Sequence, residues 1–278
     1  MSIDYFEIIK VCGEKSLSQQ DVVAIEEPLE IRLEYGSRGE REIENIAVTM
    51  RTPGNDFELA LGFLFSEGIV HNFEQIYSIY HCPKNEDKNI VCVKLKQDTT
   101  IKIKRRSFYM TSSCGVCGKS AIEHIKTSSA FLVDIEKSPL HINTNIIAEL
   151  PLKMQKAQKN FQLTGGIHAT GLFDPKANLL YLREDIGRHN AFDKLLGTAF
   201  AKGHLPLANH IILTSSRASF ELLQKSAMAG IAIFVAIGAP SSLAIKFARD
   251  CGITLIGFAR NNKFNIYSNE YRISNLPK

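Results

Sequence analysis

The feature that most constrains the fold is a regular alternation of apolar runs and helical stretches between residues 188 and 259. The apolar runs "HIILTS", "IAIFVAI" and "ITLIGFA" are short and almost wholly hydrophobic, which is typical of strands buried on both faces. Helical stretches stand before and between them: "RHNAFDKLLGTAFAKG", "ASFELLQKSAMAG" and "SSLAIKFARDCG". This alternation predicts an α/β domain with a parallel sheet, right-handed crossovers and helices on both faces.

Further elements are predicted upstream of this alternation. The runs "TGGIHATGLFD" and "ANLLYLRED" are expected to form a hairpin around the turn "DPK". Helices are predicted within "KSAIEHI" and over residues 145–160. The second half of the chain is therefore expected to be a layered α/β domain.

The first 108 residues have a different character. Five runs are rich in β-formers: "LEIRLEYG", "ENIAVTM", "IYSIYH", "IVCVKLK" and "TIKIK". One helix is predicted in "TPGNDFELALGFLFSEGIV", with Asp56 as its cap and Gly68 at its end. The pattern changes at Phe108, so we predict a small α+β domain over residues 1–108 and the α/β domain over residues 109–278.

Composition limits the partners and the compartment. The net charge is +4 and the only tight basic cluster is "KIKRR", which argues against a nucleic-acid-binding protein. The longest apolar run, "AGIAIFVAIGA", is too short to span a bilayer, so no membrane association is expected. Six cysteines, with no export signal at the start of the chain, indicate reduced thiols and a cytoplasmic protein.

Three polar loops follow the three predicted parallel strands, at residues 215–219, 238–242 and 258–263. Ligands of open α/β sheets bind beyond the carboxyl ends of the strands, and helix N-termini there attract anions. These loops therefore predict a site for an anionic, phosphorylated ligand. The alternative is that Gly, Ser and Pro only build the turns. The candidate binding residues in the loops are Ser216, Arg217, Gly238, Arg260 and Lys263.

A second polar cluster is "REDIGRHNAFDK", at a strand-to-helix junction. A simple cap explains Asp185. Arg188 and His189 exceed what a cap needs and are typical of nucleotide recognition, with the arginine clamping a phosphate. Upstream, His168 lies in a predicted strand beside two glycines, where a ligand can approach; a buried structural histidine is the more common case.

The stretch "TSSCGVCGKSA" holds Cys114 and Cys117, and four interpretations compete. A structural zinc site needs two more ligands, and no second Cys pair exists. A nucleobase-deaminase zinc site needs H-x-E and P-C-x-x-C, but the chain has "HAT" and "SSC" at these places. A thioredoxin-like dithiol fits in part. A persulfide carrier is the fourth interpretation.

Local chemistry favours a reactive thiolate. The pair precedes a predicted helix N-terminus, and Lys119, Arg105 and Arg106 lie close in sequence. Both effects stabilise a thiolate over a thiol. The neighbouring glycines leave the backbone unhindered, as a cysteine that visits a donor and then an acceptor requires. No metal ligand is predicted.

Taken together, these segments resemble the formate dehydrogenase accessory proteins called FdhD. The resemblance covers most of the chain and is carried by an ordered set of motifs: "TPGNDFELALGFLFSEGIV", "SSCGVCGKS", "TGGIHATGLF", "EDIGRHNAFDKLLG", "SSRASFELLQKSAMAG", "GAPSSLA" and "TLIGFARNNKFNIYS". It implies a cytidine deaminase-like, three-layer α/β fold for the C-terminal domain, and a homodimer.

The resemblance also implies a function. Proteins of this family are sulfur carriers that take sulfur from a cysteine desulfurase. They pass it to the molybdenum cofactor, bis(molybdopterin guanine dinucleotide), before the cofactor enters formate dehydrogenase. On this chain the persulfide cysteine matches Cys114, with Cys117 as its companion. A guanine nucleotide is expected to bind in place of the cofactor.

The family's cofactor-binding segment matches the loop of residues 258–263. The residues concerned are Phe258, Ala259, Arg260, Asn261, Asn262 and Lys263. The two asparagines replace a Pro-Gly-like turn of the family. Because Asn tolerates a left-handed backbone, we expect the loop to keep its shape.

The resulting hypothesis is a sulfurtransferase-type carrier with a cysteine persulfide intermediate. The Cys114 thiolate takes sulfur from the desulfurase, and Cys117 attacks the inner sulfur of that persulfide, forming a disulfide and releasing sulfide to the metal. The alternative is a non-catalytic, cofactor-binding chaperone whose cysteines hold only a partner or a metal. A zinc deaminase is disfavoured because its acid/base glutamate is missing.

Overall fold

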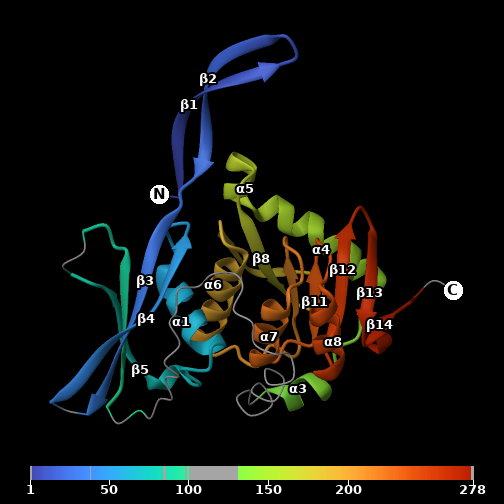
Figure 1. The fold of residues 1–278 in the computed structure, drawn as a ribbon. Coiled ribbons are helices and arrows are strands. Elements are labelled where there is room, and N and C mark those ends of the chain that lie inside the picture. Colours follow the sequence, from blue (N-terminus) through green and yellow to red (C-terminus); the bar gives the residue numbers. More distant parts are fainter. Residues whose placement is uncertain (1, 38, 84–85, 98, 100–130, 277–278) are drawn as a thin grey trace.

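The computed structural model describes residues 2–37, 39–83, 86–97, 99 and 131–276. The described chain has three visible parts: a six-stranded sheet with helices, a four-stranded sheet, and a long hairpin that projects from the rest (Figure 1). No helix in these residues has both the length and the apolar character needed to cross a membrane. The predicted runs "TIKIK" and "KSAIEHI", and the domain boundary at residue 108, fall within residues 100–130, outside the described ranges; the two-domain division stays a prediction.

The three predicted parallel strands are confirmed. They are β10 (Ile211–Thr214), β11 (Ile233–Ala236) and β12 (Thr254–Arg260), paired in parallel and in sequence order. Helices α7 (Phe220–Met228) and α8 (Ser242–Asp250) connect them, and α6 (Arg188–Ala201) precedes them, as the alternation predicts. Every residue of β10 and β11 is buried, which explains their unbroken apolar sequence.

The sheet as a whole is mixed rather than parallel, which corrects the prediction. Its order is β13-β12-β11-β10-β8-β9. The predicted hairpin exists as β8 (His168–Phe173) and β9 (Leu179–Asp185), and β8 joins β10 in antiparallel pairing. The last strand, β13 (Lys263–Ser268), returns antiparallel to β12 through a tight turn that is too short for a crossover.

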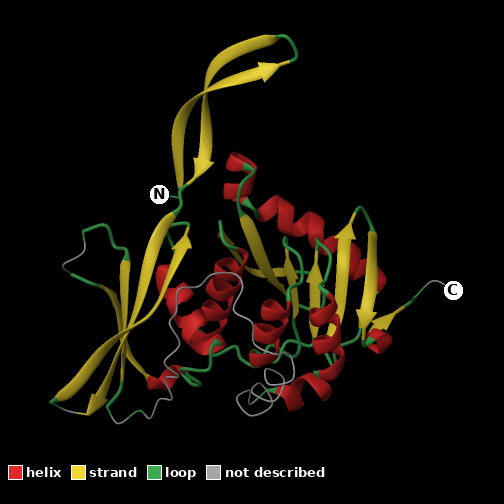
Figure 2. Ribbon diagram, in the orientation of Figure 1, coloured by secondary structure: helices red, strands yellow, loops and turns green. Residues whose placement is uncertain are grey.

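Helices cover both faces of this sheet (Figure 2). One face packs against α6, α7 and α8, and the other against α4 (Thr144–Ala157). The single helix predicted over residues 145–160 is two helices, α4 and α5 (Lys159–Thr164), because the backbone at Gln158 is not helical. The layered α/β arrangement is thus observed, whereas the cytidine deaminase-like assignment stays a prediction. Shorter elements are α3 (Leu132–Glu136), β7 (Ile142–Asn143), η2 (Glu270–Arg272) and β14 (Ile273–Ser274).

The second sheet has the order β4-β3-β6-β5. Its strands are β3 (Glu27–Ser37), β4 (Glu40–Arg51), β5 (Ile76–His81) and β6 (Ile90–Leu95), and a short η1 (Phe73–Gln75) leads into β5. Helix α1 (Asp56–Ser66) follows β4 and ends before Gly68, as predicted. Asp56 is not its cap: Asn55 holds that position in a left-handed conformation, and the Asp56 carboxylate is occupied by Arg51 at 3.0 Å.

Helices α1 and α6 join the two sheets into one core. They meet at two glycines: a Cβ atom at Gly62 would collide with the backbone of Asp193, and one at Gly197 with the backbone of Glu58. The same apolar cluster contains residues from the four-stranded sheet, from α1 and from α6 to β12. This close backbone contact fixes the position of α6, whose first residues border the candidate site.

The projecting hairpin consists of β1 (Ile3–Cys12) and β2 (Lys15–Ala24), which the sequence patterns did not predict. Ten consecutive residue pairs join the strands without a bulge. The turn holds only Gly13 and Glu14, and Gly13 has a φ of 61°, as glycine at the first position of a type II′ turn does.

Candidate functional site

The three loops predicted to form a site lie together at the carboxyl edge of the parallel strands. Backbone hydrogen bonds link them in series: the Gly238 amide donates to the Ser216 carbonyl, and the Phe258 amide donates to the Gly238 carbonyl, each at 3.1 Å. Ala218 also forms a β-bridge with Pro240. The loops therefore form one continuous polar surface rather than three separate turns.

Glycine is required at the centre of this surface. A Cβ atom at Gly238 would lie 3.0 Å from the backbone of Arg217 and from the Ser216 carbonyl oxygen. The Ser216 hydroxyl is already engaged, because it donates to the Arg217 carbonyl at 3.0 Å and lies 3.0 Å from the Thr214 hydroxyl. Ser216 thus shapes the loop, whereas Arg217 is exposed and can meet a ligand at the surface.

Two helices begin at this edge. Ser219 caps α7 by accepting from the Leu222 amide, and Ser241 caps α8 by accepting from the Ala244 amide at 3.1 Å. Each serine satisfies one amide of its first turn, so the other amides of that turn have no intrahelical partner. The positive ends of two helix dipoles therefore meet at the same sheet edge.

The start of α6 joins the same region. His189 Nε2 lies 2.8 Å from the Glu221 carboxylate and 3.5 Å from the Ser219 hydroxyl. The hydrogen bond from His189 lowers the pKa of Glu221, although partial burial opposes the shift. Since Glu221 lies in the first turn of α7, His189 fixes the α6 start against the α7 start. Arg188 precedes it and contributes positive charge to this corner.

His168 lies at the same edge, on β8. Its Nδ1 is 3.4 Å from the Ser215 hydroxyl, which also accepts from the Ala169 amide at 2.9 Å. Burial lowers the pKa of His168, and the positive charge of Arg188 lowers it further. The ring is therefore neutral at physiological pH, and Ser215, a residue that the sequence did not single out, orients it.

The loop of residues 258–263 has the predicted left-handed turn. Asn261 and Asn262 have φ values of 53° and 57°, between the paired residues Arg260 and Lys263. Both cationic side chains are exposed. The Asn-Asn pair therefore supports a tight hairpin turn, as expected from its tolerance of this conformation.

Phe258 and Ala259, which are neighbours in that loop, differ sharply in solvent exposure. Phe258 has a φ of 55° at a break in the β12–β13 register, and its side chain is 38% exposed. A bulky residue in this conformation is strained, and such strain is concentrated at functional sites. Ala259 is only 1% exposed and packs in the core, so it contributes almost nothing to the accessible surface of the loop.

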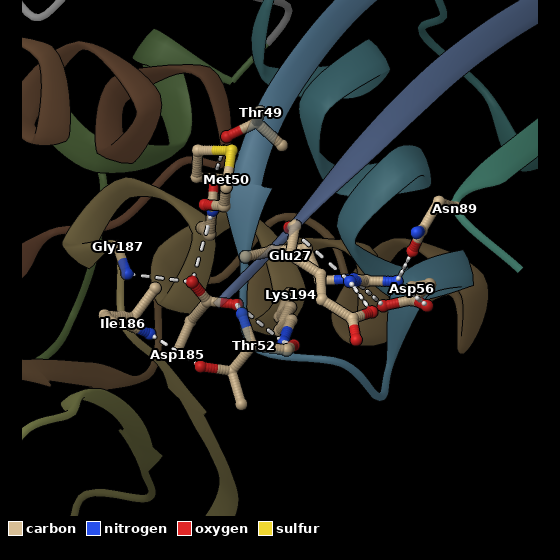
Figure 3. A network of polar contacts seen from close by, with 12 residues as sticks. Glu27, Thr49, Met50, Thr52, Asp56, Asn89, Asp185, Ile186, Gly187 and Lys194 are labelled. Carbon is tan, nitrogen blue, oxygen red and sulfur yellow. Dashed lines mark hydrogen bonds and ion pairs between the residues drawn. The ribbon is translucent and has the colours of Figure 1, made fainter. Parts of the chain in front are cut away.

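The second polar cluster divides into two groups. Arg188 and His189 face the site, but Asp185 is the hub of an internal network (Figure 3). Asp185 accepts from the amides of Thr52 and Gly187 and forms a 2.7 Å ion pair with the buried Lys194. This network locks the loop before α1 to the start of α6, so Asp185 positions the site without lining it.

A similar internal network lies deeper between the helices. Lys225 on α7 forms a 2.8 Å ion pair with Asp193 on α6 and donates to the Ser66 hydroxyl at 2.7 Å. Burial by itself lowers the pKa of Lys225, but Asp193 and Glu67 outweigh burial and raise it. Helices α1, α6 and α7 are thereby held to one another by a buried, paired charge.

Cys114 and Cys117 lie outside the described residues, so their position relative to the sheet edge is not described. Among the residues that are described, Cys12 is exposed, Cys82 is half-buried, and Cys92 and Cys251 are buried. The same residues contain no cluster of His, Cys, Asp and Glu able to hold a metal ion. A cavity of about 410 Å³ lies apart from the loops, between Thr52, Asn160 and Glu184.

Comparison with known proteins assigns the chain to a family. The model of the FdhD/NarQ family matches residues 24–274. The chain belongs to the FdhD/NarQ family. This result confirms the resemblance, and the match extends over both halves of the chain.

Curated relatives in the family are similar over nearly their whole length. The chain is 40% identical to the sulfur carrier protein FdhD of Streptomyces avermitilis, with 96% of this chain and 94% of that protein covered. It is 39% identical to the protein of the same name from Saccharolobus solfataricus, over 96% and 97% of the two chains. The protein of that name from Mycolicibacterium paratuberculosis is 41% identical, over 93% and 94%.

A solved structure supports the fold. The crystal structure of a proposed formate dehydrogenase accessory protein from Desulfotalea psychrophila matches 98% of this chain and 100% of its own chain. The TM-score is 0.73 at 22% sequence identity. The overall fold of this chain is therefore similar to that of the solved structure.

Proposed function

We propose that this chain is a cytoplasmic, homodimeric sulfur carrier that serves formate dehydrogenase. In this proposal Cys114 accepts sulfur from a cysteine desulfurase as a persulfide, and the carrier passes it to the molybdenum cofactor. The cofactor, bis(molybdopterin guanine dinucleotide), is a bound substrate here. The family membership and the name shared by relatives about 40% identical are the observations that carry the proposal.

The sheet edge has the chemistry that such a substrate needs. The guanine dinucleotide arms carry phosphates, and the edge offers two helix N-termini with Arg188, Arg217, Arg260 and Lys263 around them. Phe258 offers an exposed aromatic face for a purine ring. The glycine at position 238 lets the backbones of the first two loops pack closely, which keeps the groups of this edge near one another.

The proposed chemistry begins at Cys114. Its thiolate attacks the outer sulfur of the desulfurase persulfide, a new S–S bond forms, and the desulfurase thiolate leaves. The carrier then binds the cofactor at the sheet edge. Attack of Cys117 on the inner sulfur forms a Cys114–Cys117 disulfide and releases the outer sulfur as hydrosulfide for the metal centre.

Persulfide loading is the first test. The reduced protein is incubated with a cysteine desulfurase and cysteine, and its peptides are mapped by mass spectrometry without reduction. One added sulfur atom is expected on the Cys114 peptide. Cys114→Ala should abolish the signal, whereas Cys12→Ser, which alters an exposed cysteine elsewhere, should not. An active desulfurase that leaves the Cys114 peptide unmodified would refute the carrier.

Ligand binding is tested separately with GDP by calorimetry. Arg188→Ala and Arg260→Ala are expected to weaken binding about tenfold or more, the usual effect of removing one phosphate contact. Lys153→Ala, on the opposite face of the sheet in α4, is the matched control. Unchanged affinity in both arginine variants would show that the edge is not the binding site.

The alternative is a chaperone that binds the cofactor without carrying sulfur. The observation that favours it is that the anion-binding groups of the sheet edge, two helix N-termini with exposed arginines beside them, suit cofactor binding whether or not a cysteine carries sulfur. Activation of formate dehydrogenase by Cys114→Ala distinguishes the two. A carrier loses activation completely, whereas a chaperone keeps most of it.

A further inference from the structure

The N-terminal arm, residues 3–24, exposes large apolar side chains on both of its faces. Ile9 is 72% exposed, Leu17 66% and Phe6 53%, although each lies in a regular strand. The arm projects beyond α5, which lies beside its base (Figure 1). With ten residues in each strand, it extends about 33 Å.

Such a ribbon is not expected to be stable by itself. A two-stranded hairpin is marginal in water, and independent stability needs a third strand or a packed apolar face. The described sheet contains only β1 and β2, so within the described chain both outer edges lack a neighbouring strand. Long exposed edge strands associate readily with other chains. The arm is therefore built for contact with another surface.

On one face of the arm, the charge changes from acidic to basic along its length. Directly paired residues share a face, and the pairs on this face are Asp4–Val23, Phe6–Asp21, Ile8–Gln19, Lys10–Leu17 and Cys12–Lys15. The two carboxylates lie near the body and the two ammonium groups near the tip. The central pair divides the face into an acidic half and a basic half, each with one large exposed apolar side chain.

We infer that this face of the arm docks against the same face of a second copy of the chain, with the two arms antiparallel. A two-fold axis through the Ile8–Gln19 pair brings the basic tip of each arm to the acidic base of the other. Phe6 and Leu17 of both copies then lie in the interior of the contact. A parallel alignment would oppose like charges along the whole length, which costs free energy.

The surface is self-complementary, which is what a two-fold contact requires. Binding of a different protein, such as formate dehydrogenase or the desulfurase, would not require acidic and basic groups at equal distances from the centre of the face. The inference deepens the proposed homodimer by naming the surface that closes it. It does not depend on sulfur transfer, since persulfide loading and GDP binding are measured on other residues.

Charge reversal with rescue tests the inference on the full chain by light scattering coupled to size-exclusion chromatography. One variant makes the tip acidic (Lys10→Glu with Lys15→Glu), and the other makes the base basic (Asp4→Lys with Asp21→Lys). Each alone places like charges against each other twice, so each should dimerise at least tenfold more weakly than the wild type. A control with Lys96→Glu and Lys176→Glu matches the net-charge change of the tip variant at exposed sites away from the arm.

Mixing decides the result. An equal mixture of the tip and base variants restores attraction at both ends, so the dimer should reappear as a heterodimer. The chain with all four substitutions should also dimerise like the wild type. The inference is overturned if the wild type is a monomer, if the single-end variants dimerise normally, or if mixing restores nothing. An arm that captures only formate dehydrogenase or the desulfurase also overturns it.

Discussion

Replacing Gly62 with alanine separates the local preference of α1 from the demands of its packing. Alanine stabilises a helix interior by about 1 kcal/mol relative to glycine. At this position, however, the new Cβ would collide with the Asp193 carbonyl oxygen, and it would also lie 2.7 Å from the Asp193 carbonyl carbon and from the Gly197 amide nitrogen, where ordinary contact begins at 3.4 Å. The two helices must move apart by more than about 0.7 Å, the distance that relieves the two 2.7 Å contacts alone, because backbone atoms cannot rotate away.

The expected cost follows from these numbers. Overpacking a core costs about 1–3 kcal/mol, and a collision with backbone belongs at or above the upper end of that range. After the helical gain of alanine, a net loss of about 2–3 kcal/mol is expected, which lowers the melting temperature of a chain this large by about 5–10 °C. Urea unfolding followed by circular dichroism measures the free energy directly.

Two comparisons make the test decisive. Gly166→Ala is the matched control, because the nearest atom to its new Cβ is 3.8 Å away and no collision arises. Gly62→Ala combined with Gly197→Ala should cost less than the sum of the single changes, since the first already separates the helices. If Gly62→Ala is as stable as the wild type, the close helix contact and the reasoning from it are wrong.

Three further predictions concern the buried charges and the site. Asp193→Ala should lower the free energy of unfolding by about 3–5 kcal/mol, because it leaves Lys225 buried without its carboxylate, and adding Lys225→Met should recover much of the loss. Burial holds the pKa of His168 below its ordinary value of 6.5, so the contribution of His168 to stability is complete above pH 6.5 and is lost as the pH falls through the folded-state pKa. Between pH 7 and pH 5, the melting temperature should therefore fall less in His168→Gln than in the wild type. At Phe258, the glycine variant should be more stable than the alanine variant by about 1 kcal/mol in urea unfolding, because φ is 55°; the opposite order would mean that the backbone there is not left-handed.

Much of the candidate site could be predicted because its signals are local. Each loop follows a recognisable strand, and parallel strands place their carboxyl ends at one edge, so Ser216, Gly238 and Phe258 were expected to be neighbours. The left-handed turn at Asn261 and Asn262 follows from residue type alone. In contrast, the strain at Phe258 and the burial of Ala259 arise from the pairing of β12 with β13, which residue type does not reveal.

The polar cluster around Asp185 illustrates the opposite case. Its density predicts function, but most of its carboxylates and amines turn inward to partners that are distant in sequence. Thr52 lies 133 residues from Asp185, and Lys225 lies 32 residues from Asp193. No periodicity or motif predicts a partner so distant in sequence. The same residues are therefore consistent with a helix cap, a ligand contact or an internal ion pair.

By itself, the sequence determined the alternating helices and strands, the polar loops at one sheet edge and the family, because hydrophobic periodicity and turn residues act over a few neighbouring positions. Only the tertiary structure decided that the sheet is mixed, that two glycines let α1 and α6 touch, and that residues 3–24 form a projecting arm. Those features depend on which distant surfaces meet. That choice is made by packing and by the pairing of buried charges across the whole chain, and local sequence preference does not contain it.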